Sequence, residues 1–332
     1  KGEQQMDYAQ VGWAIAAPIL EMEEGHRIVT MRFDFVPSTM YTLNLLIKDI
    51  SINQDISRED AFSKIFKNSL EVYFTTSEGW FSAHTCEVLP PDDWGKSEIS
   101  IVATLTDANP GIVNYDPETM GAGYSSESPI VKITQRSEGS FFSYSFLKEL
   151  EVKNIAIDVD VKGMRHLLLS SDIGGISPNV PFQPFGAIPK VGSYFIIGKE
   201  ELFKKEITDL QFNIEWHSLP TDKKGFRGYF KDYGLSIKNE QFEMKLSALS
   251  DGSFTPSKEE EPLTFKMFEP HDDNPHGIKD KTTISNIDIE ALNIKADESF
   301  VMPPIFNNEA RAGFFKLEFS GPLAAFGHES YA

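Results

Sequence analysis

The stretch Arg27-Ile-Val-Thr-Met-Arg-Phe-Asp-Phe35 decides the fold class of this chain. Apolar residues recur at every second position from Val29 to Phe35, whereas Ile28 lies on the other face, which is typical of a strand with one buried face. Gaps rich in Gly, Pro and Asn separate similar segments, so we predict a mainly β protein. The same alternation predicts strands at residues 43–47, 70–74, 99–105, 130–133, 155–161, 207–216, 242–246, 263–268 and 314–319.

Helical periodicity is scarce, and the best example covers residues 57–66. Ser57 is a good N-cap residue, and Asp60 stands where a capping box carries its acidic residue. Residues 145–150 and 199–203 are expected to form single turns. The helical segment has one apolar face, made of Ala61, Phe62, Ile65 and Phe66.

The length and order of the segments predict two domains. A chain of 332 residues with 40% apolar residues can build two separate cores. A weak internal repeat supports this division, because each half carries a strand followed by a Ser-acid-Gly triplet, at residues 77–79 and 250–252. We therefore expect tandem β-sandwich-like domains at residues 1–137 and 199–332, a bridging region at 138–198, and a polar, partly ordered insertion at 256–302.

The bridging region ends in a segment dominated by proline, glycine and aromatic residues. Proline fixes backbone angles, and the neighbouring rings can be buried, so we expect a rigid connector that holds the two domains at one angle. The connector spans residues 181–198 and contains Pro181, Phe182, Pro184, Phe185, Gly186, Pro189, Gly192 and Gly198.

Composition excludes several classes of function. The 31 basic residues face 50 acidic ones, and this net charge of -19 disfavours binding to nucleic acids or anionic membranes. No run of about 18 apolar residues predicts a membrane-spanning helix. The opening Lys1-Gly-Glu-Gln-Gln lacks the pattern of a secretory signal. Because Cys86 is the only cysteine, no intrachain disulfide is expected, as in proteins of a reducing cytoplasm.

Three polar clusters are candidates for metal binding or catalysis, and none is specific. His271-Asp-Asp-Asn-Pro-His276 could hold zinc or a hard cation, but it lacks a second ligand cluster and is read as a solvated loop. Residues 158–163 imitate a calcium loop, yet Leu169 stands where a Glu is required. Cys86 follows His84 without a third group to orient the base. With no phosphate-binding glycine loop either, we predict no catalytic residue, cofactor or metal.

The tryptophans allow two interpretations. They could form a platform on which sugar rings stack, or they could pack in cores and interfaces, which is the commoner role. Trp216 shares a predicted strand face with Phe212, which favours the core, and Trp80 is expected to close one end of its sandwich. The four residues are Trp13, Trp80, Trp94 and Trp216.

With these segments in view, the chain resembles the larger baseplate-wedge protein of extracellular contractile injection systems, the phage-tail-like particles of the antifeeding-prophage and virulence-cassette type. Ala187 departs from a familiar Phe-Gly-Pro-type turn, and the polar insertion is a second departure, so local interface details stay open. The resemblance lies in residues 11–20, 24–27, 77–80, 181–186, 192–198, 216, 219–220 and 325–328, and the 181–198 segment is its specific part.

The resemblance implies a non-enzymatic structural subunit. Such a protein pairs with a second wedge protein and closes into a six-fold ring around the hub, below the sheath and its end adaptor. It is assembled in the bacterial cytoplasm as part of a particle that can be released outside the cell. The family's proteins are longer than this chain, so the resemblance implies an internal portion.

The residues themselves add candidate contact surfaces and leave two alternatives open. Open strand edges and the aromatic-proline segment are features that partners can bind. A cell-surface carbohydrate-binding or adhesin sandwich is the first alternative, and an enzyme with a pocket at His271 and His276 is the second. The candidate interface and structural residues are Trp13, Trp80, Pro181, Phe182, Pro184, Phe185, Gly186, Pro189, Gly192, Gly198, Trp216 and Pro220.

Overall fold

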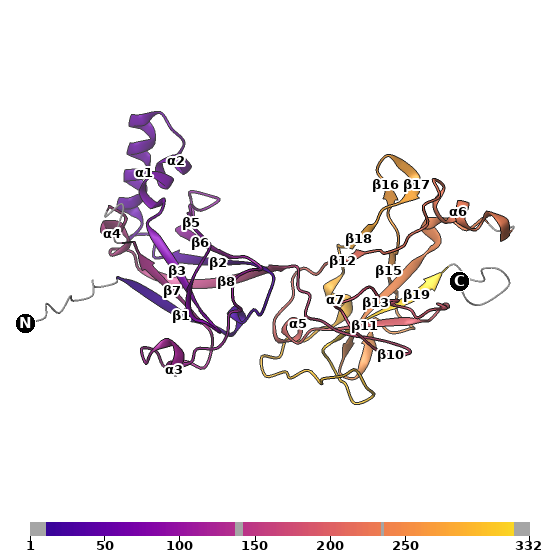
Figure 1. Cartoon of the computed structure of the whole chain (residues 1–332). Helices are drawn as coiled ribbons and strands as arrows, with labels where there is room; N and C mark the ends of the chain where they lie inside the picture. Colours follow the sequence, from indigo (N-terminus) through magenta and orange to yellow (C-terminus); the bar gives the residue numbers. More distant parts are fainter. Residues whose placement is uncertain (1–10, 137–141, 234–235, 322–332) are drawn as a thin grey trace, which may run out of the picture. The chain divides into compact units, whose positions relative to one another are not determined.

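A computed structural model describes residues 11–136, 142–233 and 236–321 of the chain, which is mainly β as the sequence predicts (Figure 1). It divides into two compact units, Lys1–Arg165 and His166–Ala332. The division falls inside the region 138–198 that we expected to bridge two domains. The part of that region up to Arg165, which includes strand β8 (Val152–Lys162), belongs to the first unit, and residues 166–198 belong to the second, so the expected bridging region is shared between the two units.

The first unit is built from two four-stranded antiparallel sheets. Their longest pairings join β2 (His26–Phe35) to β8 on one side and to β6 (Glu98–Leu105) on the other, with Met31 opposite both Ile157 and Ile101. One sheet has the order β1 (Gly12–Ala16), β7 (Ile130–Gln135), β3 (Leu70–Thr76), β4 (Gly79–Ser82). The other has the order β5 (Thr85–Leu89), β6 (Glu98–Leu105), β2 (His26–Phe35), β8.

The two sheets share one core, as in a β-sandwich. Met31 and Phe33 of β2 are buried in the same cluster as Phe74 of β3. The ring of Trp13 on β1 meets Phe33 edge-on at 5.8 Å, so it links the two sheets. Burying apolar side chains from both sheets is the main stabilising contribution to such a unit.

The first unit also carries a helical pair, of which the sequence predicted one member. Helix α2 (Arg58–Phe66) begins where expected, because Ser57 Oγ accepts a hydrogen bond from the backbone N–H of Asp60 at 3.0 Å. Helix α1 (Tyr41–Gln54) occupies the segment where we expected a strand at residues 43–47, so that prediction is wrong. The apolar run at 43–47 was too short to distinguish the two-residue period of a strand from the 3.6-residue period of a helix. The 14 residues of the helix contain no Gly or Pro that would interrupt it.

The long turn after β6 is fixed by a buried arginine. Arg27 has an exposed fraction of 0%, and its guanidinium donates to the carbonyl oxygens of Pro110, Thr106 and Asn109, each at 2.9 Å. It also donates to Gly25 at 3.0 Å. All of these acceptors are backbone groups that would otherwise need water. The remaining short helices of the unit are η1 (Pro18–Leu20), α3 (Pro117–Met120) and α4 (Phe142–Leu147).

The second unit is built around one seven-stranded sheet. Its order is β10 (Gly174–Ile176), β9 (Leu168–Ser171), β11 (Tyr194–Gly198), β19 (Phe314–Gly321), β13 (Glu243–Ser250), β14 (Ser253–Thr255), and β15 (Leu263–Lys266) also pairs with β13. Two small ladders join β12 (Phe212–Glu215) to β18 (Lys281–Ile284) and β16 (Pro270–His271) to β17 (Asn274–Ile278).

Both faces of this sheet are covered. Phe315 points into the larger core, where its ring lies 5.5 Å from Phe212 of the β12–β18 ladder. The adjacent Phe314 belongs to a smaller cluster with Ile196 and Leu249, on the other side of the sheet. Short helices complete the unit: α5 (Glu201–Lys204), α6 (Gly225–Tyr229), η2 (Lys231–Tyr233), η3 (Asn239–Gln241) and α7 (Ile289–Leu292).

The expected polar insertion at 256–302 is an ordered part of the second unit. It supplies four strands, β15 to β18, and helix α7. Ile284 and Leu292 have exposed fractions of 1% and 0%, and both belong to the main core. The segment looks polar because its strands are short and only alternate residues face inward.

The internal repeat does not extend to the topology. Strand β2 pairs with β6, whereas its expected counterpart β12 pairs with β18. Both Ser-acid-Gly triplets lie at hairpins, but Thr76 pairs with Gly79 in one and Ser250 with Ser253 in the other, a different turn register. The resemblance between the halves therefore comes from turn chemistry and not from a duplicated domain.

Within the part of the chain that the structure describes, no helix is long and apolar enough to cross a membrane.

Candidate functional site

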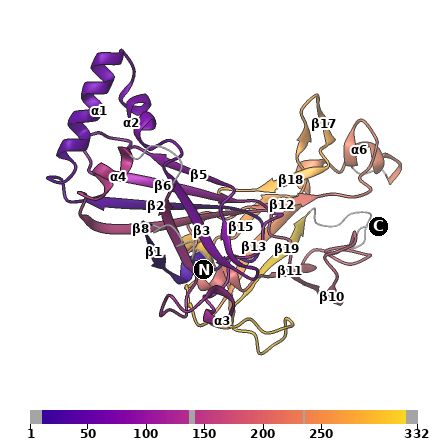
Figure 2. The same cartoon turned by 60° about the vertical axis from the view of Figure 1, so that its left-hand side comes forward.

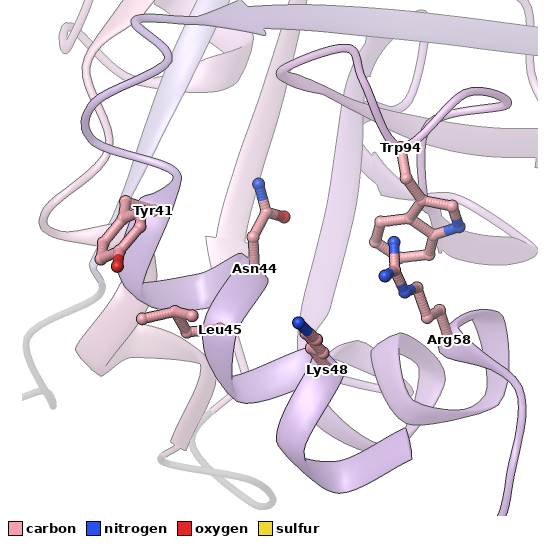
Figure 3. A pocket seen from close by; sticks show the side chains of 6 residues that line it. All are labelled: Tyr41, Asn44, Leu45, Lys48, Arg58 and Trp94. Atoms are coloured by element: carbon pink, nitrogen blue, oxygen red, sulfur yellow. The ribbon is translucent and has the colours of Figure 1, made fainter. Parts of the chain in front are cut away.

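A hollow of about 170 Å³ opens beside the helical pair of the first unit (Figure 3). Helices α1 and α2 lie next to each other in both overall views (Figure 1, Figure 2). The hollow lies between α1, the start of α2 and the loop that precedes β6. Its lining residues are Tyr41, Asn44, Leu45, Lys48, Arg58 and Trp94.

The loop residue Trp94 is held in place by α2. Its Nε1 donates a hydrogen bond to Glu59 Oε1 at 2.8 Å, and its ring lies 6.4 Å from the buried ring of Phe62. The guanidinium of Arg58 lies 5.9 Å from the ring centroid, a cation–π arrangement that Figure 3 shows at one end of the hollow. The hydrogen bond from Trp94 is the main reason that the pKa of Glu59 lies below its ordinary value. One wall of the hollow is therefore a fixed aromatic ring.

Helix α1 forms the other wall and carries an apolar stripe that faces away from the core. The side chains of Tyr41, Leu45 and Ile52 have exposed fractions of 65%, 42% and 66%. Together with Lys48 they follow the spacing i, i+4, i+7 and i+11, which places them on one face of a helix. The buried residues Leu43 and Ile47 lie on the opposite face. Isolated exposed apolar residues are ordinary, but three that are aligned beside a hollow make this face of α1 a candidate binding surface.

The charge at the hollow is opposite to that of the chain as a whole. Lys48 and Arg58 are both exposed and line it, whereas the chain carries a net charge of -19. Among the described residues neither cation takes part in a salt bridge. The carboxylate of Glu59, which borders the hollow, accepts a hydrogen bond from the Trp94 indole. The hollow thus offers positive charge to an incoming acidic group.

The size and lining of the hollow favour recognition over catalysis. Small-molecule sites usually enclose about 300–1,000 Å³, so 170 Å³ is closer to the volume of one large side chain. The lining contains no carboxylate, imidazole, thiol or hydroxyl nucleophile other than the phenol of Tyr41. The sequence did not predict this surface, because residues 43–47 were expected to form a strand. The spacing of Tyr41, Leu45, Lys48 and Ile52, which is that of one helix face, was the signal that could have revealed it.

The connector at 181–198 lies within the second unit, where it follows β10 and ends with β11. Our expectation that it links the two domains is therefore corrected: residues 163–167 connect β8 to β9 across the division. The segment is tied to the large sheet because Phe182 lies 5.4 Å from Phe195 and Phe185 lies 5.9 Å from Phe319. Phe185 is buried, but Phe182 has an exposed fraction of 39%.

The other connector residues have local roles. Gly186 and Gly192 adopt positive φ values of 77° and 91°, a region that other residues rarely enter. Gly198 is in β11, where an added Cβ would lie 2.7 Å from the ring of Phe314. Pro181 is exposed, whereas Pro184 and Pro189 are half-buried, as is Pro220 in the loop after β12.

The tryptophans do not assemble into one platform. Trp13 packs against Phe33 in the first core, and Trp216 packs at 4.9 Å from Phe268 in the second unit. The indole of Trp80 donates to the carbonyl oxygen of Met120 at 3.0 Å, with Lys132 Nζ 4.6 Å from its ring centroid. The structure thus brings none of the predicted tryptophans to the hollow except Trp94.

The polar clusters contain no assembled metal or nucleophile site. Within the described ranges no three His, Cys, Asp or Glu side chains converge as metal ligands. His271 and His276 are exposed on the β16–β17 hairpin, where Asp272 pairs with Lys279 at 2.8 Å. That pairing lowers the pKa of Asp272. Burial raises the pKa of the Cys86 thiol to about 11, which keeps it protonated and unreactive at neutral pH.

Comparison with known proteins identifies no relative: no protein-family model matches the chain, and no curated protein matches it.

Proposed function

We propose that this chain is a structural subunit of the baseplate wedge of a contractile injection system. The observation that carries the proposal is the sequence resemblance centred on residues 181–198. The proposed role is to pair with a second wedge protein and to close with it into a six-fold ring around the hub, below the sheath. The segment 325–328, which also contributes to the resemblance, lies outside the described residues.

Two features of the fold are compatible with an assembly subunit. Each unit has its own core and an open sheet edge, and β8 is an edge strand of 11 residues. An open edge of this length is a surface to which a partner strand can add. Val152 and Ile155 on β8 have exposed fractions of 50% and 37%, so its first half also offers apolar side chains to a partner.

The segment 181–198 supplies a second contact candidate, and the structure sharpens how to test it. Exchanging both Phe182 and Phe185 for Ser would damage the second core, because Phe185 is buried against Phe319. Phe182 is partly exposed, so it can be changed with less cost to folding. Val301, in the same unit but outside the segment, has an exposed fraction of 78% and provides a matched control.

The proposal is tested by deleting the gene in its bacterial host and imaging lysates by negative-stain electron microscopy. We expect sheathed particles in the wild type, none in the deletion strain, and recovery when the gene is returned. The Phe182→Ser gene should restore fewer particles than the Val301→Ser gene. Particles in normal number in the deletion strain, or no particles in the wild type, would refute the proposed function.

A further inference from the structure

We propose that the outer face of α1 and the adjoining hollow bind an acidic amphipathic helix of a second protein. We call this the α1 docking surface and define it by Tyr41, Leu45, Lys48, Ile52, Arg58 and Trp94. The inference depends on the geometry of the first unit and not on the proposed place in a baseplate.

The shape of the surface matches a helix. The stripe from Tyr41 to Ile52 runs along α1 for about 16 Å, at 1.5 Å per residue. A helix that packs along this stripe would bury apolar side chains at its own i, i+3 or i+4 and i+7 positions, as in other helix-in-groove complexes. Leu45 lines the hollow and also belongs to the stripe, so the hollow is continuous with the apolar face.

The hollow supplies the anchor point of the interface. Its volume of about 170 Å³ accommodates one large side chain, such as Leu or Phe, between α1 and the fixed ring of Trp94. Trp94 is already oriented by Glu59 and Phe62, so binding would not require this ring to be ordered. A single anchored side chain in a preformed pocket is the usual centre of a protein interface.

Charge determines which helix fits. Lys48 lies within the stripe, and Arg58 lies beside Trp94 at the edge of the hollow. None of the six residues that define the docking surface is acidic, and the adjacent Glu59 is hydrogen-bonded to the Trp94 indole. The two cations therefore favour a partner that carries Asp or Glu beside its apolar face. Phosphate backbones are a poor alternative, because only two cations are present and the chain is strongly acidic.

The same charges argue against a second copy of this chain. In a symmetric contact through this surface, the Lys48 and Arg58 side chains of both copies would enter one interface without an acidic residue from the docking surface to offset them. Such like-charge contacts oppose association. A separate acidic partner removes this conflict.

The test uses the full chain and two synthetic helical peptides. Both peptides carry Leu at i, i+4, i+7 and i+11, and they differ only in Glu or Lys at the flanking positions. Binding is measured by fluorescence anisotropy of the labelled peptide. We expect the Glu peptide to bind at least about tenfold more tightly than the Lys peptide, and increasing salt should reduce the difference.

Variants locate the binding site and test the role of charge. Leu45→Glu should weaken binding of the Glu peptide by about tenfold or more, and the double change Lys48→Glu with Arg58→Glu should reverse the preference between peptides. Val301→Glu, an exposed apolar residue of the second unit, is the matched control and should have no effect. Circular dichroism verifies that each variant is folded.

Three results would overturn the proposal. Equal binding of both peptides would show that charge does not select the partner, and unchanged binding by the Leu45 and Lys48–Arg58 variants would place the peptide elsewhere. Sedimentation equilibrium provides the third: a dimer of the free chain that Leu45→Glu abolishes would identify the occupant as a second copy.

Discussion

The two units of this chain reach a buried core by different routes. In the first, two four-stranded sheets face each other, and five of the 23 buried core residues within the described part of the unit are Phe. In the second, one seven-stranded sheet is covered on both faces by short elements. Among its described residues, nine of the 21 buried in the larger core are Phe. The first core is formed mainly by aliphatic side chains from the facing sheets, whereas in the second core large aromatic rings fill the spaces between short elements.

This difference also determines where each unit is most vulnerable. The first unit joins long strands by turns, and the buried Arg27 fixes the turn after β6 to the start of β2. The second unit depends on contacts among rings, such as Phe315 with Phe203 at 5.2 Å and with Phe212 at 5.5 Å. Loss of side-chain hydrogen bonds to the backbone should therefore lower the stability of the first unit most, and loss of buried ring volume should lower that of the second.

The largest expected effect is in the second unit. Phe315→Ala removes a fully buried ring that contacts both the sheet and the ladder, and we expect a loss of roughly 4 kcal/mol in the free energy of unfolding. Hydrogen exchange measured by mass spectrometry should show faster exchange in residues 166–321 only. Phe182→Ala, which changes a partly exposed ring, is the control and should cost about 1 kcal/mol or less. Equal acceleration in both units would contradict separate cores.

The corresponding change in the first unit is Arg27→Met. It leaves several buried carbonyl oxygens without a donor, and we expect a loss of about 3 kcal/mol in the free energy of unfolding, confined to the first unit. Urea unfolding combined with hydrogen exchange measures it. The control is Arg32→Met on the same strand, where an exposed pair with Asp158 should contribute less than about 1 kcal/mol. If both substitutions cost the same, the buried hydrogen bonds are not what fixes the turn.

A smaller effect is expected at the start of α2. Ser57→Ala removes the N-cap that accepts from Asp60 and should lower stability by about 1 kcal/mol. Ser63→Ala, an exposed position inside the same helix, should be neutral or slightly stabilising. Thermal unfolding of both variants provides the comparison, and an equal loss at both positions would show that the cap has no special role.

The sequence predicted the first unit better than the second, and the reason is strand length. Strands β2, β6 and β8 have eight to eleven residues, so an alternating pattern is repeated often enough to be recognised. Many strands of the second unit have three to five residues, and β9 to β11 were missed because alternation over so few positions is not distinctive. Pairing partners such as β12 with β18 lie far apart in the sequence and leave no local signal.

The candidate site was harder to predict than the fold. Trp94 was recognised only as one of four tryptophans, because its position beside α2 depends on a tertiary hydrogen bond to Glu59. The stripe on α1 was concealed by the mistaken strand at 43–47. Leu43 and Ile47 stand four residues apart, as do Tyr41 and Leu45, so two helical stripes in one short segment read as a continuous apolar run.

The most direct test of the account is to express residues 1–165 and 166–332 as separate fragments and to follow urea unfolding of each by circular dichroism. Two units with their own cores should each unfold in a cooperative transition. The fragment with the higher free energy of unfolding should correspond to the unit that is more stable in the intact chain. A fragment that shows no cooperative transition alone, but gains one when the other is added, would contradict the claim that the chain consists of two separately built units.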